Sequence, residues 1–202
     1  MSKLVLVLVG ALAAVALWWR RNPSACPYSQ RFWVEAVHPL ITRARLRATL
    51  APASGEHVLE VGPGTGYYAL PVADWLGPSG TLEVFDLQQE MLDHTARRAV
   101  EAGLQVVPTR GDARSLPYAD DAFDAAYLVT VLGEIPDQEA ALRELARVVR
   151  AGGRVVVGEV IGDPHWVSPG ALERRAAAAG LRLERRVGSP LGYFALLRPA
   201  VP

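Results

Sequence analysis

The segment from Glu60 to Gly66, which reads E-V-G-P-G-T-G, constrains the fold more than any other part of the chain. The apolar pair Val58-Leu59 precedes it, and residues Tyr67 to Trp75 follow with a helical pattern. Glycine adopts positive φ without strain and lets a ligand approach the backbone closely. The free N–H groups at the start of a helix attract a carboxylate or a phosphate. Together these features predict a strand, a nucleotide-binding turn and a helix.

The spacing of the glycines distinguishes between kinds of nucleotide. A dinucleotide-binding fingerprint, G-x-G-x-x-G, would place its third glycine at position 67, which is Tyr67. The order here is E-x-G-x-G-x-G, with Glu60 two residues before the first glycine. This pattern resembles the first motif of the class I S-adenosylmethionine-dependent methyltransferases. The resemblance implies S-adenosyl-L-methionine as cofactor, and a glycine-rich turn that binds nothing is the alternative.

Expected strands and helices alternate along the rest of the chain with short connections, which is typical of a parallel α/β sheet. Residues 188–192 are too short for a crossover, so the last two strands should form an antiparallel hairpin. The resemblance implies a Rossmann-like, mostly parallel sheet of seven strands, whereas spacing alone predicts only a doubly wound sheet. The expected strands are His57–Val61, Thr81–Phe85, Gln105–Thr109, Phe123–Val129, Gly153–Val160, Leu181–Val187 and Tyr193–Leu197, and the expected helices are Tyr67–Leu76, Gln88–Ala102, Gln138–Val149 and Ser168–Ala179.

Ligands of open α/β sheets bind beyond the carboxyl ends of the strands. Asp86 follows the second expected strand, and its carboxylate can accept hydrogen bonds from both hydroxyls of a ribose. The segment Gly111-Asp112-Ala113 resembles the adenine-binding segment of the family. Alternatively, Asp86 caps the next helix and Asp112 caps a turn. The expected cofactor-binding residues are Glu60, Gly62, Gly64, Gly66, Asp86, Leu87, Asp112, Ala113 and Thr130.

A second group of motifs lies around the fourth expected strand. The pattern D-x-F-D begins at Asp121, and L-R-E-x-x-R-V-x-R-x-G-G begins at Leu142. Both patterns are similar to those of the ubiquinone and menaquinone methyltransferase-like group. With the glycine motif they cover the chain from about Glu56 to Val160. The resemblance implies S-adenosylmethionine binding and does not identify the substrate.

Methyl transfer is an in-line displacement, so alignment of the reactants can supply much of the catalysis. A general base is needed when the acceptor carries a proton at neutral pH. We expect acceptor-side residues after the fourth and fifth strands, with Glu134 and His165 as the catalytic candidates. A loop histidine that packs against Trp166 is the alternative for His165. Glu159 and Asp163 are further candidates for acceptor-side roles in the same segments, and Tyr193 and Tyr28 are weaker ones.

The amino terminus differs from the rest of the chain. Residues Leu4 to Trp19 carry no charge, and Arg20 and Arg21 follow at once. A helix of this length, with interfacial tryptophans and snorkelling cations, predicts a transmembrane anchor over residues 1–21. The cations on its carboxyl flank predict a single-pass protein with its main domain on the cytoplasmic side. A cleaved signal peptide and a buried core helix are the alternatives.

Residues 22–50 are expected to join the anchor to a methyltransferase domain over residues 51–202. Pro23 and Pro27 indicate a stiff linker. From Ser29 to Leu50 apolar residues recur at helical spacing, and Pro39 should kink or divide this amphipathic lid helix. This helix carries three arginines, Arg43, Arg45 and Arg47. They would either contact anionic lipid headgroups or lie on a solvent-exposed face of the helix.

Composition limits the partners. The formal net charge is zero, which argues against general capture of nucleic acid. Cys26 is the only cysteine, so the chain has no internal disulfide, and we expect no metal site.

The predicted anchor favours a methyl acceptor in the bilayer, either a phospholipid amine or a quinone-like ring. A small apolar thiol is an alternative acceptor, and a non-catalytic cofactor-binding membrane protein or a nicotinamide oxidoreductase is an alternative function. The sequence leaves the oligomeric state open.

Overall fold

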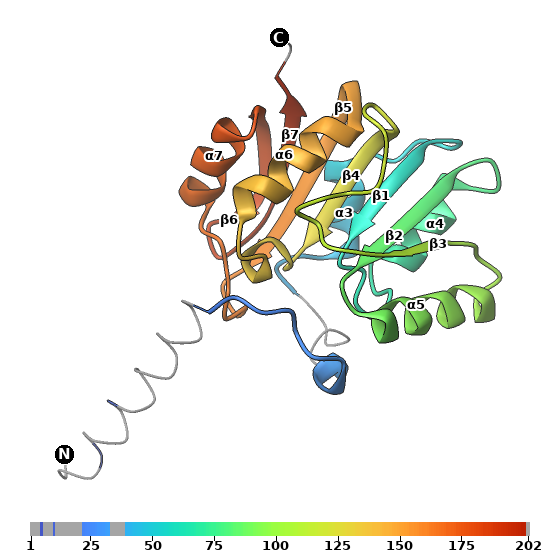
Figure 1. Cartoon of the computed structure of the whole chain (residues 1–202), viewed down its shortest axis with the longest axis horizontal. Coiled ribbons are helices and arrows are strands. Elements are labelled where there is room, and N and C mark those ends of the chain that lie inside the picture. Colours follow the sequence, from blue (N-terminus) through green and yellow to red (C-terminus); the bar gives the residue numbers. More distant parts are fainter. Residues whose placement is uncertain (1–4, 6–9, 11–21, 33–38, 201–202) are drawn as a thin grey trace.

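The computed structural model describes residues 5, 10, 22–32 and 39–200. A seven-stranded sheet with strand order β3-β2-β1-β4-β5-β7-β6 forms its centre, and helices cover both faces (Figure 1). The strands are β1 His57–Val61, β2 Thr81–Asp86, β3 Val107–Arg110, β4 Phe123–Val129, β5 Val149–Val160, β6 Leu181–Ser189 and β7 Gly192–Pro199. The helices are η1 Tyr28–Gln30, α3 Arg43–Leu50, α4 Ala69–Leu76, α5 Gln89–Glu101, η2 Leu132–Glu134, α6 Gln138–Val148 and α7 Pro169–Ala178.

The central strands are apolar on both faces because both faces are covered. In β1, Val58 packs with the helices of one face, whereas Leu59 and Val61 pack with those of the other. Such continuous apolar runs are typical of parallel strands buried between two helical layers. One layer consists of α3, α4 and α5, and the other consists of α6 and α7.

Most of the expected elements are confirmed. β1 and β4 have the expected bounds, and β6 and β7 form the expected antiparallel hairpin. The helix expected from Tyr67 begins instead at Ala69, because residues 64–68 still belong to the turn. β5 begins at Val149 and not at Gly153, because Val149 pairs with Phe123 before the register of the two strands shifts.

The segment that leads into the domain is divided, as Pro39 predicts. Residues 33–38 lie outside the described residues, and α3 begins at Arg43 with Thr42 as its cap. The Thr42 hydroxyl accepts a hydrogen bond of 3.2 Å from the Arg45 N–H, which satisfies a donor that a helix start leaves unpaired.

The arginines of α3 contact the domain. The Arg43 guanidinium donates to the Tyr67 carbonyl at 3.1 Å and lies over the Tyr67 ring, and Arg47 lies over the Trp75 ring. Arg45 donates to the Leu40 carbonyl. These contacts fasten α3 to the domain.

The predicted anchor over residues 1–21 lies, except for Val5 and Gly10, outside the described residues. Among the residues that the structure does describe, no helix has the length and apolar character needed to cross a membrane.

Candidate functional site

The glycine-rich turn follows β1 and requires its glycines. Gly62, Gly64 and Gly66 have φ values of +71°, +56° and +84°. A Cβ on Gly62 would lie 2.3 Å from Cγ2 of Val131, which is closer than real Cβ atoms approach. Both the backbone conformation and the available space therefore exclude larger residues at the first glycine.

Helix α5 holds this turn in place. The Thr95 hydroxyl donates to the Gly64 carbonyl at 2.9 Å, and the Arg98 guanidinium donates to the Thr65 carbonyl at 2.7 Å. With its carbonyls fixed from outside, the turn is rigid before any ligand arrives.

Glu60 lies at the end of β1, with 1% of its surface exposed. The Tyr127 hydroxyl donates to its Oε2 at 2.7 Å. Burial raises the pKa of Glu60 to about 8, even though the hydrogen bond from Tyr127 opposes the rise. The predicted ligand residue is therefore a buried carboxyl group with one oxygen already engaged by the protein.

Asp86 ends β2, beside the turn. Its Oδ1 accepts from the Gln88 N–H at 2.8 Å, and among the described residues no arginine pairs with it. Burial raises its pKa to about 6. A half-buried carboxylate without an arginine partner among the described residues suits a ligand that donates hydrogen bonds, such as a ribose with two hydroxyls. The neighbouring Leu87 side chain is 55% exposed and borders the same position.

Asp112 follows β3, at the next strand end. It forms a bidentate ion pair with Arg114, with an Nη2–Oδ2 distance of 2.6 Å, and also accepts from the Arg114 N–H. This pairing lowers the pKa of Asp112. The alternative role of turn cap is thus observed, while adenine binding by Asp112 and Ala113 stays a prediction.

Thr130 directly follows β4, in a conformation that non-glycine residues seldom adopt. Its φ is +56°, its N–H donates to the Gly158 carbonyl at 2.8 Å, and its hydroxyl donates to the Val129 carbonyl. Strained backbone of this kind is typical of functional sites. The structure thus brings Thr130, Asp86 and the glycine turn to the same edge of the sheet.

The loops that carry the two catalytic candidates, Glu134 and His165, are in contact. A Cβ on Gly133 would lie 1.8 Å from the His165 carbonyl oxygen, so the loops after β4 and β5 are in contact. Oε2 of Glu134 accepts from the Cys26 N–H at 3.2 Å. Burial, followed by the nearby Asp163 charge, raises the pKa of Glu134 to about 8. The His165 N–H donates to Oδ1 of Asp163 at 2.6 Å, which orders the loop after β5.

Residues 26–32, here called the strap, contact the site in a way that the sequence did not reveal. The Gln88 side chain donates to the Cys26 carbonyl at 2.9 Å and accepts from the Tyr28 N–H at 3.2 Å. The Tyr28 hydroxyl and Nδ1 of His94 lie 3.0 Å apart in a further hydrogen bond. Figure 1 shows this segment running below the sheet toward α5. The strap therefore spans the end of the predicted linker and the start of the predicted lid helix, and it contacts the site through Gln88 and Glu134.

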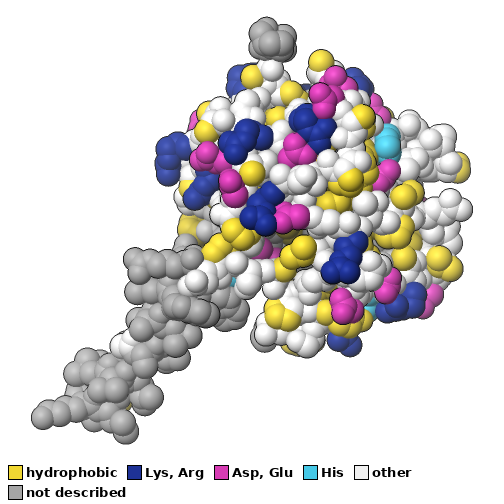
Figure 2. Space-filling view, viewed as in Figure 1, with side chains coloured by type: hydrophobic (Ala, Val, Ile, Leu, Met, Phe, Trp, Pro, Cys, Tyr) yellow, Lys and Arg dark blue, Asp and Glu magenta, His cyan; other side chains and the backbone are white. Residues whose placement is uncertain are grey.

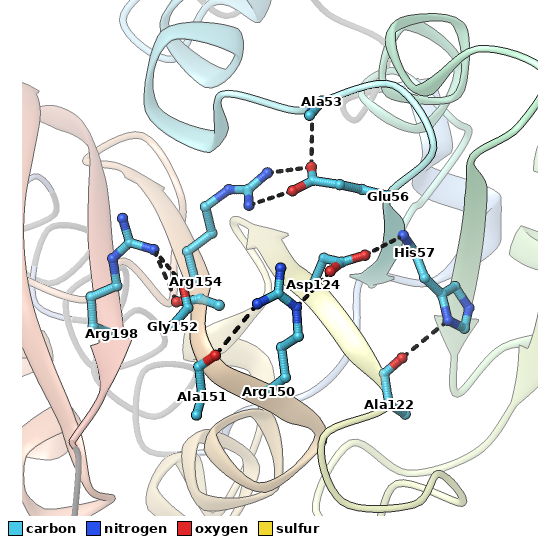
Figure 3. A network of polar contacts seen from close by, with 11 residues as sticks. Ala53, Glu56, His57, Ala122, Asp124, Arg150, Ala151, Gly152, Arg154 and Arg198 are labelled. Atoms are coloured by element: carbon cyan, nitrogen blue, oxygen red, sulfur yellow. Dashed lines mark hydrogen bonds and ion pairs between the residues drawn. The ribbon is translucent and has the colours of Figure 1, made fainter.

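The residues of the second motif group stabilise the fold away from this site. Arg154 pairs with Glu56, and Asp124 accepts from Arg150 and from the His57 N–H (Figure 3). These contacts join β1, β4 and β5 at the end of the sheet opposite the glycine turn.

Glu144 and Arg147 of the same motifs hold the loop after Asp112. Glu144 accepts from the Leu116 N–H at 2.7 Å, and Arg147 donates to the Leu116 carbonyl at 3.0 Å. Their contribution to the site is to fix the connection that carries the expected adenine-binding segment. Among the described residues, no three His, Cys, Asp or Glu side chains are grouped so as to hold a metal ion.

Comparison with protein families relates this geometry to known proteins. Residues 58–153, which run from β1 past the start of β5, match the model of a methyltransferase domain. The matched segment, slightly less than half of the chain, is similar to methyltransferase domains. This match agrees with the methyltransferase resemblance of the glycine motif.

Similar proteins include an O-methyltransferase, resE, of Aspergillus sclerotiorum, which is 38% identical over 63% of this chain and 48% of that protein. The ubiquinone/menaquinone biosynthesis C-methyltransferase UbiE of Paracoccus denitrificans is 40% identical over 54% of this chain and 44% of that protein. The chain spans about half the length of the curated relatives it matches.

A solved S-adenosylmethionine-dependent methyltransferase from Aquifex aeolicus has the same fold. The TM-score is 0.79 at 18% identity, over 87% of this chain and the whole of that one. The similarity thus extends to the described sheet as a whole, beyond the residues that match the family model.

Proposed function

We propose that the protein is a membrane-anchored methyltransferase that transfers a methyl group from S-adenosylmethionine to an acceptor in or at the bilayer. The observation on which the proposal rests is the half-buried Asp86 carboxylate, which lacks an arginine partner among the described residues and lies beside a glycine turn held by α5. This arrangement lies within the segment that matches the methyltransferase domain.

The residues at the strand ends fit the cofactor. Asp86 would accept from its ribose hydroxyls, and the turn at Gly62 to Gly66 leaves its backbone open to the rest of the nucleoside. When bound, the cofactor supplies an electrophilic methyl group. The protein contributes by holding the two reactants in line and by excluding water, which is sufficient for a large rate enhancement.

Glu134 and His165 are placed to handle a proton of the acceptor. A carboxyl group whose pKa is raised to about 8 by burial exchanges protons near neutral pH, where general acid–base catalysis is most effective. Glu134 is the better placed of the two, because its carboxyl group is largely buried and held by the strap through the Cys26 N–H.

Apolar side chains at the same edge support an acceptor from the membrane. Ile161 and Leu191 are about half exposed, and the Ile161 N–H donates to the Leu191 carbonyl at 2.8 Å. Phe32 of the strap is 69% exposed. Figure 2 shows hydrophobic side chains on the lower part of the visible face. We place this edge toward the bilayer, with residues 1–21 as a single-pass anchor and the domain on the cytoplasmic side.

A phospholipid amine and a quinone-like ring are the favoured acceptors. Similarity to the UbiE protein of Paracoccus denitrificans supports a quinone-like ring as the acceptor. The proposed membrane anchor supports either acceptor, because a tether to the bilayer raises the local concentration of membrane components around the domain. A small apolar thiol is the second candidate, supported by the same exposed apolar side chains.

The experiment is to incubate membranes that contain the full chain with S-adenosylmethionine labelled in its methyl group. We expect the label to extract with the lipid fraction, and membranes that carry Asp86→Ala to show little incorporation. Label that stays in the aqueous phase as a methylated small molecule would contradict the membrane acceptor. No transfer to any fraction, with the cofactor still bound, would favour a non-catalytic protein.

A further inference from the structure

Five arginines lie on one side of the sheet, on α3 and on the edge strand β6. Helix α3 lies on the face opposite α6 and α7 and packs against β5, β6 and β7 (Figure 1). The two elements are far apart in the sequence, so only the fold brings their arginines together. These residues, here called the basic face, are Arg43, Arg45 and Arg47 of α3 and Arg182 and Arg185 of β6.

The register of the β6–β7 hairpin determines where the two β6 arginines point. Arg185 pairs with Leu196, and Arg182 pairs with Arg198. Directly opposed residues of an antiparallel pair project to the same face of the sheet, and Leu196 packs in the core beneath α3. Nη2 of Arg185 also donates to the Ala48 carbonyl of α3 at 2.6 Å. Both arginines therefore lie on the α3 side of the sheet.

The basic face has a net positive charge. Helix α3 contains no acidic residue, and Glu184, the acidic residue of β6, accepts from Arg198 at 2.7 Å. Within the described part of the chain, none of the five arginines forms an ion pair, whereas Arg150 and Arg154 of β5 are each paired with a carboxylate. Four of the five are exposed, and Arg45 is half-buried. Their charge is therefore available to a partner in solution or on a membrane.

The arginines of the basic face keep hydrogen-bond donors for such a partner. Arg43 uses its Nε, and Arg45 and Arg185 each use one Nη, to donate to backbone carbonyls. A guanidinium has further N–H groups in a planar fork that matches the oxygens of a phosphate. The contacts within the protein thus hold these side chains in place and leave donors for phosphate groups.

The aromatic rings on this side are covered by the same arginines. The Arg43 guanidinium lies 4.1 Å from the centroid of the Tyr67 ring, and that of Arg47 lies 5.2 Å from the Trp75 ring. Proteins that bind single-stranded nucleic acid need open rings on which bases stack. The basic face therefore favours phosphates that carry no bases, such as those of lipid headgroups.

Exposed apolar side chains adjoin the basic face at the end where α3 begins. A Cβ on Gly192 would lie 2.4 Å from Cβ of Leu40, so the segment before α3 contacts the tip of the β6–β7 hairpin. Leu191 at this tip is 51% exposed, and Ile161, whose N–H donates to the Leu191 carbonyl, is 49% exposed. Cations next to exposed apolar side chains are typical of surfaces that lie on an anionic bilayer.

We propose that the basic face docks on anionic phospholipid headgroups, with Leu191 and Ile161 entering the headgroup layer. The arginines are distributed over a helix and a strand, which suits a surface of many phosphates better than one bound anion. Because Arg43 contacts Tyr67 directly after the glycine turn, docking brings the candidate site next to the membrane. The inference rests on the proposed function for the presence of a bilayer, and it adds the orientation of the domain.

Chemical modification of arginines tests the docking in the full chain. The protein is reconstituted in nanodiscs of phosphatidylcholine, with or without one-third phosphatidylglycerol, and mass spectrometry follows the reaction of each arginine with phenylglyoxal. We expect phosphatidylglycerol to slow the modification of Arg47, Arg182 and Arg185 by about threefold or more. About 1 M NaCl, which reduces the Debye length to about 3 Å, should abolish the difference. Arg97 on α5 and Arg143 on α6, both exposed, should react equally fast in the two kinds of disc.

A matched pair of variants tests whether α3 and β6 act as one surface. Replacing both Arg182 and Arg185 with Gln should reduce the protection of Arg47 by phosphatidylglycerol at least twofold. Replacing both Arg97 and Arg143 with Gln removes the same charge elsewhere and should leave that protection unchanged. Full protection of Arg47 in the β6 variant would overturn the proposal.

The remaining outcomes separate this inference from the proposed function. Equal modification of the basic face in the two kinds of disc, with the protein retained in both, would overturn the docking alone. Equal slowing at Arg97 and Arg143 would reveal a general charge effect and would also overturn it. Protection by an RNA oligonucleotide but not by phosphatidylglycerol would identify nucleic acid as the partner and exclude lipid. Protein recovered free of both kinds of disc would refute the membrane location and this inference together.

Discussion

The Tyr127 hydroxyl donates a hydrogen bond of 2.7 Å to Oε2 of Glu60, and both side chains are buried between β4 and β1. Glu60 precedes the glycine turn by two residues, so this bond fixes the base of the cofactor site. Although Glu60 belongs to the motif by which the cofactor was predicted, its observed contact is within the sheet.

Tyr127→Phe removes the donor and leaves a buried carboxyl oxygen unsatisfied. We expect the free energy of unfolding to fall by about 1–3 kcal/mol. Urea denaturation measures the change. Combining Tyr127→Phe with Glu60→Leu should cost less than the sum of the two single changes, because the orphaned oxygen is removed as well. Strict additivity would show that the bond contributes nothing.

Glu60→Gln should change how stability depends on pH. The pKa of Glu60 is raised from its ordinary value of 4.5 to about 8 in the folded protein. The folded state therefore binds more protons than the unfolded state between these values, and stability falls as pH rises through that window. Unfolding measured from pH 5 to 8 should show a smaller decline in Glu60→Gln than in the unmodified chain. An identical slope in the two proteins would mean that Glu60 is ionised in the fold.

Asp86→Ala should weaken S-adenosylhomocysteine binding by about 1–3 kcal/mol, because charge-assisted hydrogen bonds to the ribose are lost. Calorimetric titration gives the affinity. Asp74→Asn alters an exposed acid on α4, away from the turn, and serves as the control. If Asp86→Ala and Asp74→Asn bind equally well, Asp86 does not hold the ribose.

Gly62→Ala and Gly152→Ala form a matched pair. Both glycines have positive φ, +71° and +77°, so each substitution should cost about 1–2 kcal/mol of backbone strain. A Cβ at Gly152 meets nothing within 4 Å, whereas at Gly62 it meets Val131 at 2.3 Å. We expect Gly62→Ala to lose about 1–3 kcal/mol more stability and to bind S-adenosylhomocysteine more weakly. Equal losses of stability in the two variants would show that the Val131 side chain can move away from the new Cβ without destabilising the fold.

Gln88→Ala should release the strap. The Gln88 side chain bonds both the Cys26 carbonyl and the Tyr28 N–H, and its loss removes both hydrogen bonds at once. Hydrogen exchange at the Tyr28 amide should accelerate, while exchange in β1 stays unchanged. Unchanged protection of Tyr28 would mean that the other strap contacts, Tyr28 with His94 and Cys26 with Glu134, suffice to hold the strap.

The fold was predictable because its signals are local. The apolar runs of the strands and the glycines at the turns encode the sheet residue by residue, so β1 and β4 were placed without error. The start of β5 was missed because Val149 belongs to a helical pattern in sequence and joins the sheet only through pairing with Phe123.

The candidate site could be predicted only at residues that belong to a recognisable sequence motif. The glycine turn was predicted correctly because positive φ restricts the residue types at Gly62, Gly64 and Gly66, whereas ribose binding by Asp86 stays a prediction. Residues 22–50 were expected to form a linker and a lid helix, but the hydrogen bonds of the strap with Gln88 were not predicted. These bonds join residues about 60 positions apart and leave no local pattern. The joining of α3 and β6 in one basic face likewise depends on tertiary contacts, such as that of Arg185 with the Ala48 carbonyl.

Calorimetric titration of the full chain with S-adenosylhomocysteine, and separately with NADH, tests the central claim most directly. We predict saturable binding of S-adenosylhomocysteine at one site per chain and no measurable binding of NADH. Tight binding of NADH alone would contradict the assignment of this sheet edge as an S-adenosylmethionine site.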